Sequence, residues 1–196
     1  MILKRHNGCD PISINIEQLS DADLSNLDLS YVDFSKKDLE RTIFKNSNLS
    51  HCLFNRTHFS KTIFENCNLR NAEFKESYVI ECNFRKINAE NIIFTKCELS
   101  YSSFWDSDLT DAKFYECYLA DTDFSDANLE KSIFNYCFIA CADFRGANLN
   151  FVDLSEVASW ENAKFNGAYG KWKMPSKWWN SVGYYWEKKL STGSRI

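Results

Sequence analysis

Cysteine and histidine are the residues of this chain that could bind a metal or attack a substrate, and the sequence holds eight and three of them. A zinc site needs converging ligands, such as two cysteines about two to four residues apart with a second pair of cysteines or histidines. Cys137 and Cys141 have such a separation. However, the repeat described below places the first inside the protein and the second outside. We therefore expect no metal site.

Catalytic motifs do not stand out either. His6, His51 and His58 have no acidic residue or nucleophile at a recognisable spacing. The sequence shows no Ser-His-Asp order, no glycine-rich phosphate loop and no metal-binding helix motif. Serine and aspartate are so frequent that a pairing of the two is uninformative. We expect surface histidines, no cofactor, and a protein that is not an enzyme.

A period of five residues organises most of the chain. Every fifth residue from Leu24 to Leu154 is apolar, which gives 27 consecutive positions: 13 Phe, 11 Leu, and one each of Val79, Ala89 and Ile139. The residue two places earlier is usually small. An α-helix requires a period of about 3.6 and a β-strand a period of 2. Neither element explains the pattern.

Four such units would close one square turn. Phe recurs at every fourth unit in two series, residues 44 to 144 and residues 34 to 134, which are two units out of step. The two series therefore fall on opposite sides, and the remaining sides carry mainly Leu. Opposed rings with Leu between them would fill the interior at the density of protein cores. Stacked strands lie about 4.8 Å apart, so seven turns would form a rod about 35 Å long.

Three units show the repeat plainly: Ala22-Asp-Leu-Ser-Asn26, Ala127-Asn-Leu-Glu-Lys131 and Ala147-Asn-Leu-Asn-Phe151. They resemble the units of the pentapeptide-repeat family. The resemblance covers about residues 20–170 and implies an all-β fold, a right-handed quadrilateral parallel β-helix (solenoid) of about seven coils. The glycine that is usual in the family at the fifth position is nearly absent, with Gly146 and Gly167 as exceptions. Near Val157 the period continues one residue late, which predicts a bulge.

Both ends of such a rod expose unpaired strand edges and need caps. Residues 1–19 are expected to form the N-terminal cap, with a strand over residues 12–16, where apolar and polar residues alternate. The Trp-rich, basic residues 171–196 are expected to cap the other end of the β-helix of residues 20–170, helical from Pro175 to about Leu190. One face of this helix would form a cap or a dimer contact through Trp179, Val182, Trp186 and Leu190.

Lysines among the tryptophans of residues 171–196 also suit binding to single-stranded nucleic acid. A capping helix with solvated lysines explains the same residues. We therefore do not expect direct nucleic-acid binding, whereas a homodimer stays open.

The small inward position of the repeat holds six cysteines: Cys52, Cys67, Cys82, Cys97, Cys117 and Cys137. The last three follow one another at steps of one turn and should stack. Buried free cysteine behaves as a small apolar residue, so we expect core filling rather than disulfides or metal binding. One outward column is expected to hydrogen-bond from coil to coil through Asp28, Asn48, Asn68, Asn88, Asp108, Asn128 and Asn148.

Composition and charge limit the classes of protein to which the chain can belong. The chain is 44% hydrophobic and 26% charged, with a net charge of −4, which excludes a disordered, collagen-like or membrane-embedded protein. Some opposite charges one turn apart should pair between coils, as Lys45 with Glu65 and Arg56 with Glu76. Residues 98–130 hold nine acidic residues and one basic residue. This acidic belt is expected to lack such partners.

Outward aromatic residues complete the candidate sites. Tyr78, Tyr118 and Phe138 fall in one column, which Glu98 interrupts, and Tyr101, Tyr115 and Tyr136 are also expected outside. Clustered exposed aromatic residues often mark protein interfaces. We predict a protein-binding surface that draws on Tyr78, Tyr118, Phe138, Trp105, Asp106, Asp108 and Asp126.

Two functions follow as hypotheses. Some members of the family look like duplex DNA, bind DNA gyrase or topoisomerase IV, and protect it from quinolones or toxins. Duplex DNA carries about one charge per 1.7 Å, or roughly 20 over 35 Å, whereas residues 21–170 carry a net charge of −9. We therefore favour a non-catalytic scaffold, effector- or adaptor-like, that binds another protein through its side faces. The alternative is a DNA mimic that binds a type II topoisomerase.

Localisation follows from the lack of long apolar segments. No apolar run follows Lys4 and Arg5, as a signal peptide would require. None approaches the ~20 residues that span a bilayer. We expect a bacterial cytoplasmic protein that does not bind a membrane, or one delivered to a host cell without such a signal.

Overall fold

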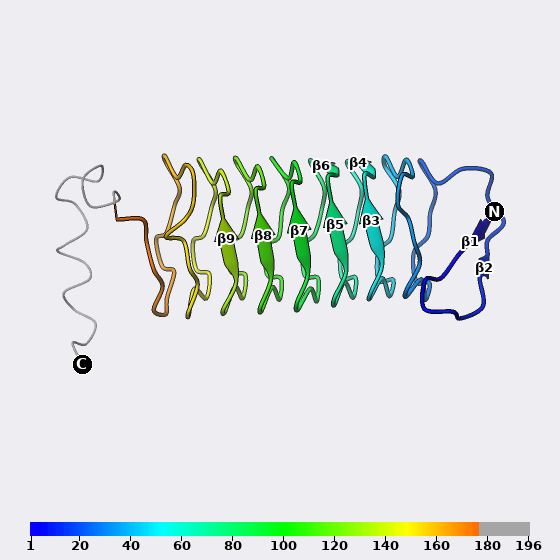
Figure 1. Cartoon of the computed structure of the whole chain (residues 1–196), viewed down its shortest axis with the longest axis horizontal. Coiled ribbons are helices and arrows are strands. Elements are labelled where there is room, and N and C mark those ends of the chain that lie inside the picture. The colour runs from blue at the N-terminus through cyan, green and yellow to red at the C-terminus, as the bar shows by residue number, and fades with distance from the viewer. Residues whose placement is uncertain (177–196) are drawn as a thin grey trace.

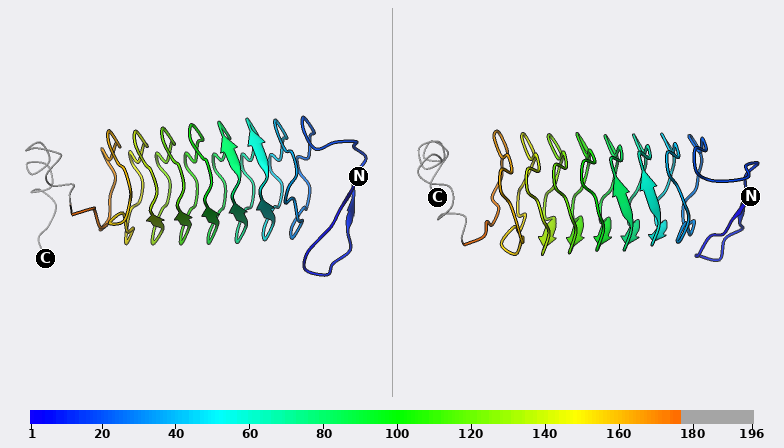
Figure 2. Two further views of the ribbon diagram at one scale, coloured as in Figure 1. Left: turned by 45° about the horizontal axis from the view of Figure 1, so that its top comes forward. Right: turned by 90° about the horizontal axis from the view of Figure 1, so that it is seen from above.

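A computed structural model describes residues 1–176, in which the chain winds as an all-β solenoid along one axis (Figure 1). Its largest sheet has five parallel strands in the order β3 (Leu53–Asn55), β5 (Glu73–Lys75), β7 (Ile93–Thr95), β8 (Lys113–Tyr115) and β9 (Ile133–Asn135). A second parallel sheet, of β4 (His58–Ser60) and β6 (Tyr78–Ile80), lies on another side of the solenoid (Figure 2). No helix occurs within residues 1–176.

Each strand of the two parallel sheets pairs with the segment that lies four repeat units later in the chain. Phe54 lies beside Phe74, and Phe94 beside Phe114. The five-stranded sheet therefore represents about four turns of the solenoid. Isolated bridges repeat the same spacing in four columns, which begin with Asp23↔Ile43, Asp28↔Asn48, Asp33↔Leu53 and Asp38↔His58. Each turn thus has four sides, one for each repeat unit.

We number the four walls by their buried central residues: wall 1 contains Phe44, wall 2 Leu49, wall 3 Phe54 and wall 4 Phe59, and each series continues at steps of one turn. Every central residue from Leu24 to Leu154 is at most 1% exposed. Rings stack along walls 1 and 3 and meet edge-on across the interior. Phe104 stacks on Phe124 with centroids 5.1 Å apart, and its ring lies at 87° to that of Phe114 at 6.4 Å. The two phenylalanine series therefore fill the core from opposite walls.

Each side ends at a corner residue in the left-handed conformation. The angle φ lies between 53° and 63° at 27 non-glycine residues, which recur at five-residue intervals from Asp21 to Cys141 and again at Phe151 and Asn162. None of them is Val, Ile or Thr, whose branched Cβ is unfavourable at positive φ. The corner therefore accepts many residues besides glycine, provided that they are not branched at Cβ.

Hydroxyls and thiols at the small inward position bond to the preceding coil. The Ser107 hydroxyl donates to the Phe84 carbonyl at 2.7 Å and accepts the Ile87 N–H at 3.2 Å. Cys97 Sγ donates to the Phe74 carbonyl at 3.4 Å. All six cysteines predicted inside are buried and free. They take the same place in the wall as serine and threonine and make the same kind of bond.

The outward asparagine column also bonds between coils. Four steps are joined by amide groups: Asn48 to Asp28 at 2.9 Å, Asn68 to Asn48 at 3.0 Å, Asn128 to Asp108 at 3.2 Å and Asn148 to Asn128 at 2.8 Å. The column lies on wall 2. At these four steps the amides therefore stabilise the stacking of coils.

An N-terminal hairpin covers the first coil (Figure 1). Its strands, β1 (Ile2–Leu3) and β2 (Ile12–Ser13), are antiparallel, and β2 is shorter than the alternation of residues 12–16 predicts. Leu3 is 3% exposed and joins the core, while Ile12, Ile14 and Ile16 pack half-buried against it. The backbone N–H of His6 donates to the Tyr31 carbonyl at 3.0 Å.

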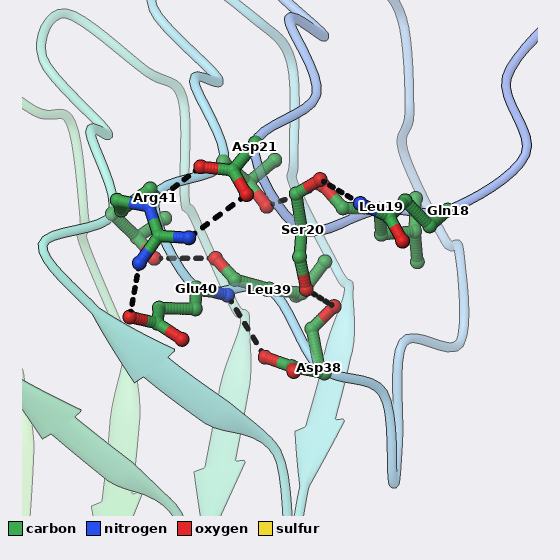
Figure 3. A network of polar contacts seen from close by, with 10 residues as sticks. Gln18, Leu19, Ser20, Asp21, Asp38, Leu39, Glu40 and Arg41 are labelled. Atoms are coloured by element: carbon green, nitrogen blue, oxygen red, sulfur yellow. Dashed lines mark hydrogen bonds and ion pairs between the residues drawn. The ribbon is translucent and has the colours of Figure 1, made fainter.

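The chain enters the first coil through a polar network around Arg41 (Figure 3). Arg41 Nε and Nη2 donate to the two carboxylate oxygens of Asp21 at 2.5 and 2.9 Å, and Nη1 contacts Glu40. The hydrogen bond from Arg41 lowers the pKa of the Asp21 carboxyl. The pair ties the first corner to the corner of the next coil.

Near the C-terminal end, one turn contains 21 residues instead of 20, and the 20-residue spacing then returns. Bridges join residues 21 apart at Phe138↔Ser159 and Asn148↔Tyr169, but 20 apart again at Asp153↔Lys173. The structure therefore contains the one-residue shift of the repeat that the sequence predicts near Val157. At Gly170, φ is 107° and a Cβ would lie 2.6 Å from the Asn150 nitrogen, so the return to register requires glycine.

The predicted C-terminal helix falls almost entirely beyond residue 176. Trp179, Val182, Trp186 and Leu190 lie outside the described residues. Within them, Trp160, Phe165, Ala168, Trp172 and Met174 pack partly buried against the C-terminal end of the core.

Candidate protein-binding surface

The exposed aromatic residues gather on wall 4 in one column of outward side chains. This aromatic column consists of His58, Tyr78, Glu98, Tyr118 and Phe138, which β bridges join step by step. Tyr118 stacks on Phe138 with ring centroids 4.8 Å apart and planes at 4°. Tyr78 is 62% exposed and Tyr118 51%. The column faces outward because each member directly precedes a buried central residue, and successive side chains of a strand point to opposite faces.

A shallow hollow of about 420 Å³ opens beside the aromatic column. It is lined by Lys96, Glu116, Tyr118, Tyr136, Phe138 and Ala158. Tyr136 reaches it from the corner between walls 3 and 4, where Lys96 Nζ and Glu116 Oε2 form an ion pair at 3.5 Å. Aromatic faces beside a polar rim are the usual composition of a protein interface.

Trp105 and its acidic neighbours lie elsewhere. Trp105 is half-buried on wall 1, where its Nε1 donates to Asp126 Oδ2 at 3.2 Å. The Arg85 guanidinium and the Lys86 ammonium lie 4.5 and 5.1 Å from the centroid of its ring. The indole is therefore already engaged within the protein.

The predicted surface thus divides among three walls. Tyr78, Tyr118 and Phe138 share wall 4, Trp105 lies on wall 1 with Asp126 and Asp106 at its corners, and Asp108 lies on wall 2 in the asparagine column. Asp108 accepts from Thr110 Oγ1 at 2.6 Å. The aromatic part and the acidic part therefore do not form one contiguous site.

The acidic belt encircles the solenoid instead of marking one face. Its corner residues in one turn are Asp106, Asp111, Glu116 and Asp121, one on each corner. The expectation that the belt lacks partners one turn away is wrong for Glu116, which pairs with Lys96. Glu130 pairs with the adjacent residue Lys131 at 3.4 Å, not with a residue of another coil.

Ion pairs between coils form elsewhere as predicted. Lys45 pairs with Glu65 at 3.1 Å and Arg56 with Glu76 at 2.8 Å, and Arg70 contacts Glu90. Lys61 and Glu81, 3.8 Å apart, were missed from the sequence although they also lie one turn apart. Such partly exposed pairs contribute tenths of a kcal/mol each.

The buried thiols of Cys67, Cys82 and Cys97 are held in the protonated form. Burial raises the pKa of Cys67 and of Cys82 to about 12. Hydrogen bonding to Cys117, together with burial, raises the pKa of Cys97. A protonated thiol is a poor nucleophile and a poor metal ligand. Among residues 1–176, no three metal-ligating side chains converge.

Two of the histidines support the N-terminal hairpin. The His51 ring stacks on Tyr31 at 4.5 Å, and His6 Nε2 is hydrogen-bonded to the His51 carbonyl at 2.7 Å. His58 begins the aromatic column, with its ring 6.2 Å from that of Tyr78.

Other exposed rings lie away from wall 4. Phe151 is 62% exposed and Tyr169 59%, at the corner after wall 2 and on wall 2. They were not singled out from the sequence, although the period places both outside. Within the described part of the chain, no helix has the length and apolarity of a membrane span.

Two family models match the part of the chain that contains the repeat. A family model described as a pentapeptide repeat region matches residues 73–144, and one described as pentapeptide repeats (8 copies) matches residues 18–56 and 52–88. No curated protein matches the sequence.

The solved structures that match this chain include two named proteins. A trypsin-treated variant of QnrB1, a plasmid-mediated fluoroquinolone resistance protein, is 20% identical over 78% of this chain and 86% of that chain, with a TM-score of 0.43. HetL, a pentapeptide repeat protein involved in heterocyst differentiation regulation in the cyanobacterium Nostoc sp. strain PCC 7120, is 16% identical over 81% and 90%, with a TM-score of 0.37.

Proposed function

The chain belongs to the pentapeptide-repeat family, and on this premise we propose that it is a non-catalytic scaffold that binds another protein through wall 4. The contact would centre on the aromatic column and the adjoining hollow. The molecule would act by holding a partner on a rigid wall rather than by chemistry on a substrate.

One observation carries the proposal. Tyr118 and Phe138 stack in parallel on the surface, 51% and 38% exposed, beside a hollow with one ion pair at its rim. Backbone bridges on both sides fix the main chain at Tyr118 and Phe138, and the two rings stack on each other, so little conformational entropy would be lost when a partner covers them. Aromatic side chains on a rigid base are typical anchors of protein interfaces.

The finer architecture belongs to the same proposal. We infer a right-handed quadrilateral rod of about seven coils over residues 20–170, with caps formed by residues 1–19 and 171–196. Trp179, Val182, Trp186 and Leu190 would serve as a cap or a dimer contact. We propose a cytoplasmic setting, or delivery to a host cell.

A capture experiment with matched variants tests the proposal. The full chain is immobilised and exposed to host lysate, beside a Tyr118→Ala/Phe138→Ala variant and a Phe151→Ala/Tyr169→Ala control. Both variants remove two exposed rings, but only the first changes wall 4. A partner that the first variant loses and the control retains supports the proposal. A partner that both variants retain would contradict it.

The competing function, a DNA mimic that binds a type II topoisomerase, has its own assay. DNA gyrase supercoiling is measured with micromolar protein, with and without a quinolone. We expect neither inhibition of supercoiling nor relief of drug poisoning, because the acidic corners encircle the rod and some are paired with lysines. Either effect would favour the DNA mimic.

A further inference from the structure

One position of the aromatic column carries a carboxylate between two aromatic rings. We call each position of the column, one per coil, a rung. Glu98 lies between Tyr78 and Tyr118, and a β bridge joins it to each. Consecutive coils lie about 4.8 Å apart, so the two tyrosines are separated by two steps, about 9.6 Å. Both tyrosine side chains are more than half exposed. A group lying over Glu98 would therefore have an accessible ring on either side.

The neighbouring rung shows the spacing that such a group would adopt. Tyr118 and Phe138 stack at 4.8 Å with nearly parallel planes. A planar group over Glu98 at the same spacing would lie about 4.8 Å from each tyrosine ring, within the ~6 Å at which a ring face attracts a cation. On wall 1 the same solenoid already holds a cation over one ring, where the Arg85 guanidinium lies 4.5 Å from the centroid of the Trp105 ring.

Glu98 keeps a free acceptor and an uncompensated charge. Its Oε1 accepts hydrogen bonds from the backbone N–H and the hydroxyl of Ser100, which fix the orientation of the carboxylate. Within residues 1–176, Oε2 has no hydrogen bond or ion pair. The two corners that flank Glu98 in its own coil hold Lys96 and Tyr101, and Lys96 is already engaged by Glu116. The rung is therefore both acidic and aromatic.

We propose that this rung, formed by Tyr78, Glu98 and Tyr118, binds an arginine side chain of the partner protein. The inference rests on the proposed function and names the chemistry that the partner presents. The guanidinium would stack between the two rings and donate to Glu98 Oε2. Arginine suits the site better than lysine because its cation is planar, stacks on aromatic faces and is weakly hydrated.

Short peptides test the site without a known partner. The isotope-labelled full chain is titrated with acetyl-Gly-Arg-Gly-amide and with acetyl-Gly-Lys-Gly-amide, and backbone amide shifts are followed by NMR. We expect saturating shifts at residues 78, 98 and 118 for the arginine peptide, with an affinity at least about threefold higher than that of the lysine peptide. Equal affinities for the two peptides would overturn the proposal.

Variants at position 98 separate the charge from the fold. Glu98→Gln should weaken the arginine peptide about tenfold, because a charge-assisted hydrogen bond is lost. Glu73→Gln, at the same repeat position on wall 3, should leave binding unchanged. Glu98→Tyr completes the ring column and should abolish binding while the chain stays folded. Undiminished binding in Glu98→Gln would overturn the site.

The capture experiment then distinguishes the two proposals. A partner lost by Tyr118→Ala/Phe138→Ala but retained in full by Glu98→Gln would overturn the arginine site and leave the scaffold function standing. A partner retained by both variants would overturn the function, while the peptide titration would still decide the site.

Discussion

At the corners, one backbone angle decides which residues the solenoid accepts. Lys36 has φ of 62° and an exposed side chain. Lys36→Val should lower the free energy of unfolding by about 1–2 kcal/mol, because a branched Cβ is crowded at this angle. Lys36→Asn should leave it nearly unchanged. Urea denaturation measures the difference.

The adjacent lysine supplies the control for that prediction. Lys37 is also exposed but is not among the residues with positive φ. Lys37→Val should therefore change the free energy of unfolding by no more than about 0.5 kcal/mol. Equal losses in the two valine variants would show that the corner angle is not the cause.

The buried thiols predict a loss of stability at alkaline pH. The pKa of Cys67 and of Cys82 is raised to about 12 by burial, whereas a thiol in the unfolded chain ionises near its ordinary value, about 8.5. Between roughly pH 9 and 12 the unfolded state has lost protons that the folded state keeps. The free energy of unfolding therefore falls as the pH rises, by about 1.4 kcal/mol per thiol and pH unit.

Unfolding by urea at pH 8, 9 and 10 checks this slope. Cys67→Ser keeps a donor toward the Phe44 carbonyl, to which the thiol now donates at 2.8 Å. The variant should therefore show a shallower slope, by the contribution of one proton. If its slope equals that of the wild-type chain, the Cys67 thiol does not cause the effect.

At the scale of a single wall, the inward serines are not equivalent. Ser107 both donates to the preceding coil and accepts the Ile87 N–H. Ser107→Ala should lower the free energy of unfolding by about 1–3 kcal/mol, because a buried N–H loses its acceptor. Ser132 is equally buried, but its hydroxyl has no hydrogen-bond partner among residues 1–176. Ser132→Ala should be neutral or stabilising. Denaturant midpoints of the two variants measure the difference. Equal losses of stability in Ser107→Ala and Ser132→Ala would refute the distinction.

The walls also show how far the sequence determines the structure. The period alone identifies the buried series from Leu24 to Leu154 and the shared column of Tyr118 and Phe138, because vertical neighbours are one turn apart in the chain. The period sets which side chains point outward, but not the rotamer that each exposed side chain adopts on the surface. The sequence predicts Trp105 as a free contact, but its ring turns toward Arg85, Lys86 and Asp126. The hollow on wall 4 likewise depends on how Tyr136 leaves its corner, which one sequence does not specify.

At the scale of the whole molecule, the exposed ends of the rod decide whether it stays a single unit. Leu3, in strand β1 of the N-terminal hairpin, is buried against the core at 3% exposure, whereas its neighbour Ile2 is 66% exposed. Leu3→Asp should displace the hairpin and uncover the first coil, whose free strand edges favour association. Light scattering after size exclusion should show mass that rises with concentration for Leu3→Asp and not for Ile2→Asp. A monodisperse Leu3→Asp variant would contradict this role of the hairpin.

The constant register of four units per turn has a consequence for how such a chain can change length in evolution. Duplication of a gene segment that encodes four units, anywhere between Asp23 and Asp153, would add one complete turn and give each old residue a neighbour of the same repeat position. Gain of a single codon would move every later side chain to a different place in its unit. Within residues 1–176, the bridges show one such insertion near the C-terminal end, and the frame returns at Gly170. Genes of this kind should therefore lengthen and shorten in whole turns.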